Sequence, residues 1–568
     1  MENKWIENTS VSPVEVETLQ QSLNIDPILC SLLIQRKINS FDAAKTFFRP
    51  ALGDLHDPYL MCDMQAAVVR LECAIAKGEK ILIYGDYDVD GTTAVALVYS
   101  YFQQFYERIG YYVPDREKEG YGISKIGIDW AKSQGYSLIV ALDCGIKSVL
   151  EIDYAKTLGI EFIIGDHHTP GAELPAAVAV LDPKRKDCTY PFKELSGCGI
   201  GFKLIQAVAQ KRGMNVASIY CYLDLVAVSI ASDIVPIVGE NRILAYYGLK
   251  RFNENPCPGL DALKHMANQV TVFGIEDIIF QIGPRINAAG RIRHAEDAVK
   301  LLISKTAHEA RKGCLLIEQH NLKRREVDGT ITQEAIRYIK ENPELIEKQT
   351  TVLYNKRWHK GVIGIVASRL VEEYYRPTVI LTQSNGHVTG SARSVRGFDL
   401  YEALNDCSDL LIQYGGHKYA AGLTMEEQQI PAFQQKFEQV VSSRITPEQL
   451  KRVIKIDQRL PLEYLSAKFL RILKQFAPFG PQNPAPTFCS TIAGINTKVS
   501  IVGKDHLKMH IRLINGDSFN AIGFGLGRFY SPLHQGANFD MCYQVSERIW
   551  RNEVYWQLNV KDIKILRN

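Results

Sequence analysis

Three aspartates alternate along one short segment near residue 90. Asp86, Asp88 and Asp90 follow an apolar run at residues 81–84 and precede a run with helical spacing at residues 94–105. In an extended chain, residues two apart project from the same face. Three carboxylates that close repel one another unless a cation lies among them, and oxygen ligands of this kind suit a hard divalent metal ion. The segment therefore predicts a metal site, although by itself it also fits a solvated acidic loop at a strand end.

Further acids and imidazoles follow later apolar runs. Each has an ordinary structural explanation, as a helix cap or as a turn residue. Four successive apolar segments that end in Asp or His nevertheless form a pattern, because an α/β sheet brings the ends of its strands together. The additional residues are Asp143 after residues 137–142, Asp166, His167 and His168 after residues 161–165, and Asp233 after residues 223–230.

Six oxygen or nitrogen ligands at one sheet edge would be enough to hold two cations roughly 3.5–4 Å apart. An imidazole among the ligands favours Mn²⁺, and Mg²⁺ is also compatible with this oxygen-rich set. Two such ions polarise a phosphoryl group and generate hydroxide near neutral pH. The predicted chemistry is therefore hydrolysis of a phosphoanhydride or a phosphodiester.

Short strand-like runs and helical segments alternate along the part of the sequence that would position these residues. This alternation predicts an α/β domain with a parallel sheet covered on both faces, in which the site lies beyond the carboxyl ends of the strands. The apolar runs lie at residues 81–84, 137–142, 161–165 and 178–181, and the helical segments between them include residues 126–134 and 148–158.

Composition narrows the class of protein. The net charge of +3 is too small to attract nucleic acid through the bulk field, so such binding must come from local patches. The 12 cysteines contain no C-x-x-C pair and are typical of buried thiols in a reducing compartment. We expect no leader peptide in the first ten residues, no membrane partner and, as the default, a cytoplasmic location.

Changes in the pattern of apolar and polar residues along the sequence predict five parts. Gly313 and Gly329 argue against one unbroken helix in the third of them. The predicted parts are a helical lead-in at residues 1–75, an α/β domain at 76–294, a helical connector at 295–345, a smaller α/β domain at 346–446 and a β domain at 447–568.

The smaller α/β domain carries a second set of polar residues. Ser391 and Arg393 could present a hydroxyl and a guanidinium to one phosphate. Gly415 and Gly416 permit close approach of the backbone to a ligand. A surface ion pair for the arginine and a β-turn for the glycines fit the sequence equally well.

The last part has the alternation of half-buried antiparallel strands. Apolar and polar residues alternate strictly at residues 507–513 and again at 554–560. A compact barrel with a basic and aromatic outer face fits an OB-like binder of single strands. A barrel that only packs against its neighbours has the same pattern.

These motifs together resemble the DHH phosphoesterases and, within them, the RecJ family of single-strand-specific DNA exonucleases. The resemblance covers about residues 55–565. It rests on Gly85-Asp86-Tyr87-Asp88-Val89-Asp90-Gly91, Asp143-Cys144-Gly145, Asp166-His167-His168 and Ala231-Ser232-Asp233, with further landmarks at residues 283–291, 360–367, 390–394, 415–422 and 479–484.

The resemblance implies roles for individual residues. Asp143 would be the bridging ligand, and His168, with Asp166 beside it, would face the scissile phosphate. Some members of the superfamily have His where Tyr84 stands, so this position is a departure from their pattern. The implied metal ligands are Asp86, Asp88, Asp90, Asp143, His167 and Asp233; the implied 5′-phosphate pocket is Arg116, Ser391 and Arg393; the implied contacts near the cut are Arg285, Asn287 and Arg291; and His417 would line the cleft.

The implied fold is a DHH domain, a long helical connector, a DHHA1 domain and an OB-like barrel. The implied activity is 5′→3′ degradation of single-stranded DNA to mononucleotides in repair and recombination, with two Mn²⁺ or Mg²⁺ ions. The single-strand-binding protein and a helicase are the implied protein partners. The alternatives are a nano-RNase or cyclic-dinucleotide phosphodiesterase of the same superfamily, which generally lack the C-terminal β domain, and an inactive nucleic-acid-binding scaffold, which would have eroded metal positions.

Overall fold

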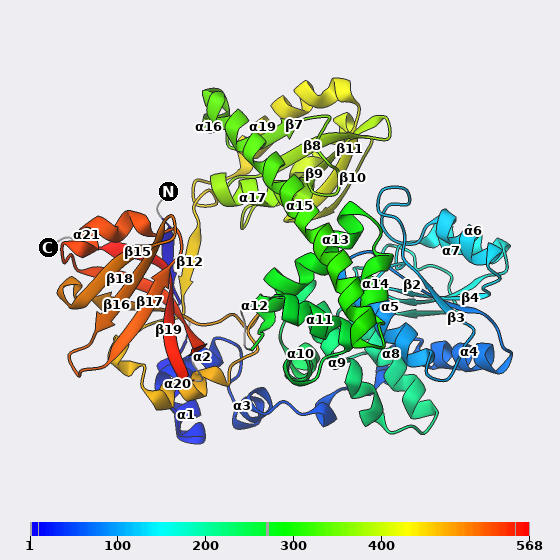
Figure 1. Ribbon diagram of the computed structural model, residues 1–568, viewed down its shortest axis with the longest axis horizontal. Helices are drawn as coiled ribbons and strands as arrows, with labels where there is room; N and C mark the ends of the chain where they lie inside the picture. The colour runs from blue at the N-terminus through cyan, green and yellow to red at the C-terminus, as the bar shows by residue number, and fades with distance from the viewer. Residues whose placement is uncertain (1–2, 9–10, 268–271, 551–552, 567–568) are drawn as a thin grey trace. The chain divides into compact units, whose positions relative to one another are not determined.

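The computed structural model describes residues 3–8, 11–267, 272–550 and 553–566 (Figure 1). The chain divides into two compact units. The larger unit comprises Trp5–Asn287, Ala295–Cys314 and Ile454–Asn568, and the smaller unit comprises Met1–Lys4, Ala288–His294 and Leu315–Val453.

A five-stranded parallel sheet forms the centre of the larger unit. Its order is β3-β2-β4-β5-β6, and every neighbouring pair is parallel. From β2, the next strand in the sequence (β3) lies on one side, and the later strands (β4, β5 and β6) lie on the other. The strand order therefore switches between β2 and β4, and α/β sheets bind ligands at such a switch point. The strands are β2 (Ile81–Gly85), β3 (Ile109–Tyr112), β4 (Leu138–Leu142), β5 (Glu161–Gly165) and β6 (Ala179–Leu181). The predicted parallel sheet is confirmed, with β3 as an additional edge strand.

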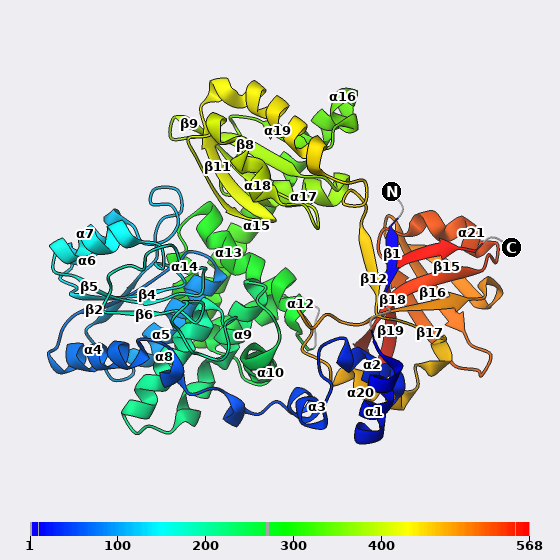
Figure 2. The ribbon, with the colours of Figure 1, turned by 180° about the vertical axis from the view of Figure 1, so that it is seen from behind.

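Helices cover both faces of this sheet, because its strands are apolar on both sides (Figure 2). Side chains of α6 (Lys125–Ser133) and α7 (Val149–Thr157) share a buried cluster with alternate residues of β2, β4 and β5. Helices α5 (Val89–Phe102) and α8 (Gly197–Lys211) contact each other and the strands. Helix α4 (Met64–Ala76) packs against α8 and β6.

The apolar segment at residues 223–230 is a helix, so Asp233 follows the end of a helix and not the end of a strand of the sheet. Helix α9 (Leu223–Ser232) is buried from Leu223 to Ala231 and packs against α5 and α10 (Gly239–Glu254). A helix that is buried all round is apolar at almost every position, so its sequence resembles that of a buried strand.

The helical connector consists of two helices. Helix α14 (Glu296–Leu302) ends before residues 303–306, and α15 (Ala307–Glu341) then continues without a break through Gly313 and Gly329. The expected interruption at the glycines is therefore wrong. The remaining helices of this region are α11 (Pro258–Met266), α12 (Ile275–Asp277) and α13 (Gly283–Ile292).

The smaller unit contains a mixed sheet of order β10-β11-β9-β8-β7, in which only β7 and β8 are parallel. Helices α15 and α17 (Ile363–Tyr374) contribute to one buried cluster, and α18 (Leu400–Asn405) and α19 (Ile430–Arg444) contribute to another. The strands are β7 (Thr351–Tyr354), β8 (Thr378–Ser384), β9 (His387–Arg393), β10 (Gln413–His417) and β11 (Ala420–Met425).

A seven-stranded sheet forms the C-terminal part of the larger unit. Its order is β13-β14-β18-β19-β17-β16-β15. The pairs β13–β14 and β17–β19 are parallel, so the prediction of purely antiparallel strands is wrong for these two pairs. The strands are β13 (Gln458–Arg459), β14 (Thr487–Ile492), β15 (Thr497–Val502), β16 (His506–Arg512), β17 (Ser518–Gly523), β18 (Phe539–Trp550) and β19 (Glu553–Ile565).

The N-terminal helices share their core with this C-terminal sheet. Leu29, Leu32 and Leu33 are buried in one cluster with Phe488, Met509 and other residues of the β domain. The helices are α1 (Pro13–Leu23), α2 (Pro27–Ile34) and α3 (Phe41–Phe48), and a strand β1 (Lys4–Glu7) before them pairs with β12 (Val453–Ile456). The expected lead-in thus contains a strand as well as helices, and it packs with the far end of the sequence.

No helix in the described parts of the chain has both the length and the apolar character needed to cross a membrane.

Candidate metal centre

Asp86, Asp88 and Asp90 occupy the transition from β2 to α5. Asp86 directly follows the strand, Asp88 is the N-cap of α5 and accepts a hydrogen bond from Gly91 N at 3.0 Å, and Asp90 lies in the first helical turn. The expectation of an extended chain is therefore wrong, and a tight strand-to-helix turn brings the three acids together. Gly91 is required here, because a Cβ at this position would lie 2.4 Å from Asp86 O.

The carboxylate of Asp90 is fixed by groups that are distant in sequence. Gly197 N and Cys198 N, at the N-terminus of α8, donate to its two oxygens at 2.7 and 2.8 Å. Ser229 Oγ of α9 donates to Asp90 Oδ1 at 2.7 Å. The positive end of a helix dipole favours a carboxylate at this position. Sequence reasoning gave no signal for Ser229, because it lies 139 residues away from Asp90.

Asp143 follows β4 in an unusual backbone conformation. Its φ of 60° lies in the left-handed region, where Asp is tolerated but uncommon. It does not cap α7, whose N-cap is Ser148. A Cβ at Gly197 would come within 2.6 Å of Asp143 Cβ, so the start of α8 packs directly on this residue. Strain and close packing at one buried acid are typical of a functional position.

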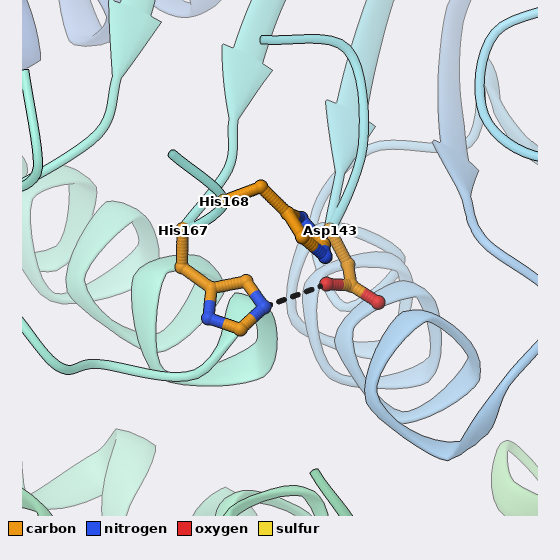
Figure 3. Close-up of side chains that lie close together, drawn as sticks. All are labelled: Asp143, His167 and His168. Carbon is orange, nitrogen blue, oxygen red and sulfur yellow. Dashed lines mark ion pairs between the residues drawn. The ribbon is translucent and has the colours of Figure 1, made fainter. Parts of the chain in front are cut away.

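His167 brings Asp90, Asp143 and Asp233 into one cluster, and Figure 3 shows its ring beside Asp143 and His168. Its Nε2 lies 3.2 Å from Asp143 Oδ1, 3.5 Å from Asp233 Oδ2 and 3.6 Å from Asp90 Oδ2. Asp233 is the C-cap of α9, so a helix end and three strand ends meet here. Three groups among the described residues have ligand atoms close enough to share an ion: Asp86, Asp88 and Asp143; Asp90, His167 and Asp233; and Asp143, His167 and His168.

The chemistry of this cluster fits divalent cations. Asp86 Oδ1, Asp143 Oδ1 and both ring nitrogens of His167 are buried and have no hydrogen-bond partner among the described residues. Burial and the neighbouring carboxylates raise the pKa of Asp86, Asp143 and Asp233. Burial lowers the pKa of His167, which keeps an imidazole nitrogen available as a ligand. Buried acids without partners are costly unless a cation lies among them. Asp143 and His167 each belong to two of the three groups, so these two residues connect the cluster.

His168 and Asp166 form a pair beside the cluster. His168 Nδ1 lies 2.7 Å from Asp166 Oδ1, and the buried Asp166 also accepts the N–H groups of Ile146 and His167. Burial lowers the pKa of His168, but the hydrogen bond to Asp166 outweighs this effect and raises the pKa to about 9. Tyr121, which sequence reasoning missed, places its hydroxyl 3.3 Å from the His168 ring and 3.3 Å from Asp143 O.

Asp182 is a further acid at the same sheet edge that sequence reasoning missed. It directly follows β6, so the pattern of an apolar run ending in Asp applied to it as well. Its side chain is buried, Oδ1 accepts Lys184 N at 2.7 Å, and Oδ2 has no partner among the described residues. Burial and the charge of Asp166 raise the pKa of Asp182 to about 7.

The raised pKa of Asp182 predicts a pH-dependent effect of Asp182→Asn on stability. Ionisation opposes folding here, so the stability that neutral Asp182 contributes is present below its unfolded pKa near 4 and is lost as the pH rises through about 7. We expect Asp182→Asn to stabilise the metal-free protein more at pH 8 than at pH 5, by about 2 kcal/mol. Urea denaturation of both proteins at the two pH values measures this difference, and an equal effect at both would contradict it.

Arg116 and Tyr84 lie beside the turn that carries Asp86. The Arg116 guanidinium lies over the Tyr87 ring, 5.0 Å from its centroid, and its charge acts on Asp86. Tyr84 OH donates to Gly122 O at 3.0 Å and accepts a hydrogen bond from Ser124 N. Tyr84 therefore holds the loop that carries Tyr121 and does not replace a histidine ligand.

The predicted phosphate-pocket residues of the smaller unit share one face of its sheet. One row across the sheet consists of Ser391 in β9, Gly422 in β11 and Gly415 in β10. A second row consists of Arg393, Ala420 and His417 in the same three strands. These rows are two residues apart, so their side chains point the same way. Arg393 Nη1 donates to Ser391 Oγ at 3.1 Å. Gly415 and Gly416 lie within strand β10, so the alternative of a β-turn is wrong.

The remaining predicted contacts lie on helix α13. Arg285 and Asn287 belong to the larger unit, and Arg291 belongs to the smaller unit, where it donates to Gly361 O at 3.1 Å. On α15, the buried Asp328 pairs with both Arg324 and Arg369.

Comparison with known proteins identifies similar chains along the whole length. Residues 80–230 match the DHH family, N-terminal domain; residues 347–443 match the DHHA1 domain; and residues 456–562 match the RecJ OB domain. The single-stranded-DNA-specific exonuclease RecJ of Bacillus subtilis is 35% identical over 97% of this chain and 70% of its own length. The enzyme of the same name from Salmonella typhimurium is 32% identical over 96% and 97%.

A solved structure is similar to the whole chain. The crystal structure of RecJ in complex with Mn²⁺ from Thermus thermophilus has a TM-score of 0.84 and 26% identity, and the match covers 100% of this chain and 80% of that one. The corresponding Mg²⁺ complex has a TM-score of 0.79.

Proposed function

The chain belongs to the RecJ family of single-stranded-DNA-specific exonucleases, and from this premise we propose that it hydrolyses single-stranded DNA from the 5′ end to mononucleotides. The observation that carries the proposal is the convergence of Asp90, Asp143 and Asp233 within 3.2–3.6 Å of His167 Nε2, with Asp143 Oδ1 and both His167 ring nitrogens buried and without a hydrogen-bond partner among the described residues. Such a cluster is suited to phosphodiester hydrolysis by bound cations.

Two divalent ions, Mn²⁺ or Mg²⁺, would be held by Asp86, Asp88, Asp90, Asp143, His167 and Asp233. When bound, they would supply Lewis acidity and lower the pKa of bound water. The His168 imidazolium, held by Asp166, would face the scissile phosphate and offset the negative charge that develops there. The backbone anchors on Asp166 keep this ring in one orientation during the reaction.

A pocket for the terminal 5′-phosphate would explain the polarity of cutting. We infer that Arg116, Ser391 and Arg393 form it, with Arg285, Asn287, Arg291, Gly415, Gly416 and His417 along the strand near the cut. Gly364, in the first turn of α17, lies so close that a Cβ there would be 2.9 Å from Ser391 Oγ and 3.0 Å from Arg393 Nη2. A helix N-terminus, a hydroxyl and a guanidinium on one spot suit a phosphate. A docked end lets only the adjacent phosphodiester react.

Arg393→Ala should reduce the preference for 5′-phosphorylated over 5′-hydroxyl strands. A charge-assisted contact contributes about 1.5–3 kcal/mol, so the ratio of kcat/KM for the two substrates should fall about 10- to 100-fold. Competition between the two strands in one reaction measures this ratio, and the exposed Arg357→Ala serves as the matched control. An equal loss on both substrates would refute the assignment of Arg393.

The C-terminal domain would bind the rest of the strand. Directly paired residues of β15, β16, β17, β19 and β18 form one polar row across the sheet. His510 Nδ1 contacts Asn520 Oδ1 at 3.1 Å within it, and exposed Lys508 and Arg512 flank His510 along β16. The row is Lys498, His510, Asn520, Gln557 and Ser546. Basic and polar side chains of this kind suit the backbone of a single strand.

We propose a role in DNA repair and recombination in the cytoplasm, with the single-strand-binding protein and a helicase as partners. The test of the function is digestion of 5′- and 3′-labelled single strands and of duplex, with short RNA and cyclic dinucleotide in parallel. Mononucleotides released first from the 5′ end of single-stranded DNA support the proposal. Preference for short RNA or cyclic dinucleotide would favour the other phosphodiesterases, and binding without cutting would favour a scaffold.

A further inference from the structure

The larger unit contains a groove of about 840 Å³ that shares no residue with the metal cluster. Helix α10 and residues 273–277 line one side of it, and α20 (Ala467–Lys474), residues 475–479 and strands β18 and β19 line the other. Pockets that bind small ligands have volumes of roughly 300–1,000 Å³. The groove is therefore large enough for a segment of a polymer.

Arg242 fixes the two sides of the groove to each other. This buried residue of α10 donates to Gln475 O, Phe476 O and Ala477 O on the opposite side, and to Phe47 O. Its guanidinium also lies 3.8 Å from the centroid of the Phe47 ring. A buried arginine whose N–H groups donate to the carbonyl groups of two chain segments holds both segments in place. The groove is therefore a built feature of the unit.

Aromatic side chains line the groove. Tyr246 is 42% exposed and belongs to α10, one turn after Arg242. Phe479 and Trp556 line the opposite side and are partly buried. Nucleobases stack on such rings with little dependence on sequence.

The charged residues of the groove leave an excess of positive charge. Glu547 pairs with Lys474 at 2.6 Å, and Asp277 accepts Gly274 N at 2.9 Å. Among the described residues, no carboxylate lies within ion-pair distance of the three remaining cations. With Glu276 and Asp277 as the remaining acids, the four cations and three carboxylates of the lining leave one positive charge in excess. The three remaining cations are Lys250, Arg471 and Arg548, all exposed. Phosphate groups would complement this charge.

The groove continues into the polar row of the C-terminal sheet. Arg548 lines the groove, and its Nε donates to Gln557 Oε1 at 3.2 Å. Gln557 is a member of the row and is paired with Asn520 of β17. A strand bound along the row would therefore reach the groove at Arg548.

We propose that this groove binds single-stranded DNA beyond the nucleotide being removed, with bases stacked on Tyr246 and Trp556 and phosphates near Lys250, Arg471 and Arg548. The inference rests on the proposed function and adds a surface for DNA on α10, in the unit that carries the metal cluster. It assigns to α10, through Tyr246 and Lys250, a role in holding long substrates that the metal centre does not perform.

The test compares Tyr246→Ala/Lys250→Glu with a control double variant, Tyr338→Ala/Lys340→Glu, which makes the same changes at an exposed pair on α15. Fluorescence anisotropy with long and very short labelled oligothymidylates in chelator, at the same series of salt concentrations for every protein, gives the affinities and their salt dependence. Hydrolysis of the short 5′-phosphorylated strand is measured on the same protein preparations, with Mn²⁺ in place of the chelator. The loss of one stacking contact and one phosphate contact should weaken long-strand binding about 10- to 100-fold.

The groove is supported if the test variant loses affinity for the long strand, cuts the short strand at the wild-type rate and has a shallower salt dependence, while the control variant matches the wild type. Unchanged long-strand affinity overturns the groove, and so does an equal loss on long and short strands. Absence of cutting by the wild-type protein would instead count against the proposed function, so the two failures are distinguishable.

Discussion

Asp143→Asn should abolish hydrolysis of single-stranded DNA, with a loss of at least about 10³-fold in kcat. Asp143, like His167, belongs to two of the three ion-sharing groups, and its buried Oδ1 lies 3.2 Å from His167 Nε2. An amide keeps the shape of the side chain but removes the charge that would hold cations on both sides. Bound metal ions would supply several kcal/mol of transition-state stabilisation, so a weakened centre would lose most of the rate.

The same substitution should leave the fold intact and stabilise the metal-free protein. Removing one of several crowded buried carboxylates relieves their mutual repulsion. Thermal unfolding in chelator should therefore give an equal or higher Tm for Asp143→Asn, and the rise in Tm on adding Mn²⁺ should be smaller than in the wild type. Asp153→Asn, an exposed site on α7, is the control. Full activity of Asp143→Asn in Mn²⁺ would contradict its assignment as a ligand.

His168→Ala should lower kcat by about 10²- to 10⁴-fold with little change in affinity for DNA. The ring lies beside the cluster and is held by Asp166 at 2.7 Å, so its contribution belongs to the reaction more than to binding. Single-turnover rates at saturating enzyme separate the chemical step from binding. His265→Ala, at an exposed histidine of α11, is the control.

Asp166→Asn tests whether Asp166 acts through His168. An amide removes the charge that raises the pKa of His168 and turns a donor toward backbone N–H groups. The loss in rate should be about 10- to 100-fold, as for other groups that orient an active-site imidazole. Combined with His168→Ala it should add almost nothing further. Additive effects of the two substitutions would show that Asp166 works independently of His168.

Much of the site followed from the sequence because its ligands follow strands. Asp86 and Asp143 come directly after β2 and β4, His167 is the second residue after β5, and parallel strands end at one edge. The periodicity of buried strands and the spacing of the acids were sufficient there. The same rule predicts that Asp182, which directly follows β6, lies at this edge as well.

The parts that sequence could not supply depend on long-range packing. Asp233 follows a helix that is buried on all sides, and such a helix has the same apolar run as a strand. The anchoring of Asp90 by Gly197 and Ser229 joins elements more than 100 residues apart. The N-terminal leucines pack with the β domain, and nothing local in residues 13–48 indicates that partner. For the same reason, removal of residues 445–568 would expose apolar side chains, so point substitutions are the better probe of the C-terminal domain.

We expect the cluster around Asp143 and His167 to bind the cations that cut DNA. The most direct test titrates Mn²⁺ into metal-free protein and counts bound ions by electron paramagnetic resonance, while release of nucleotides is followed on the same samples. We predict about two ions per chain, hydrolysis that rises with their binding, and loss of both in Asp143→Asn. Nucleotide release at full rate with no bound ion would contradict it.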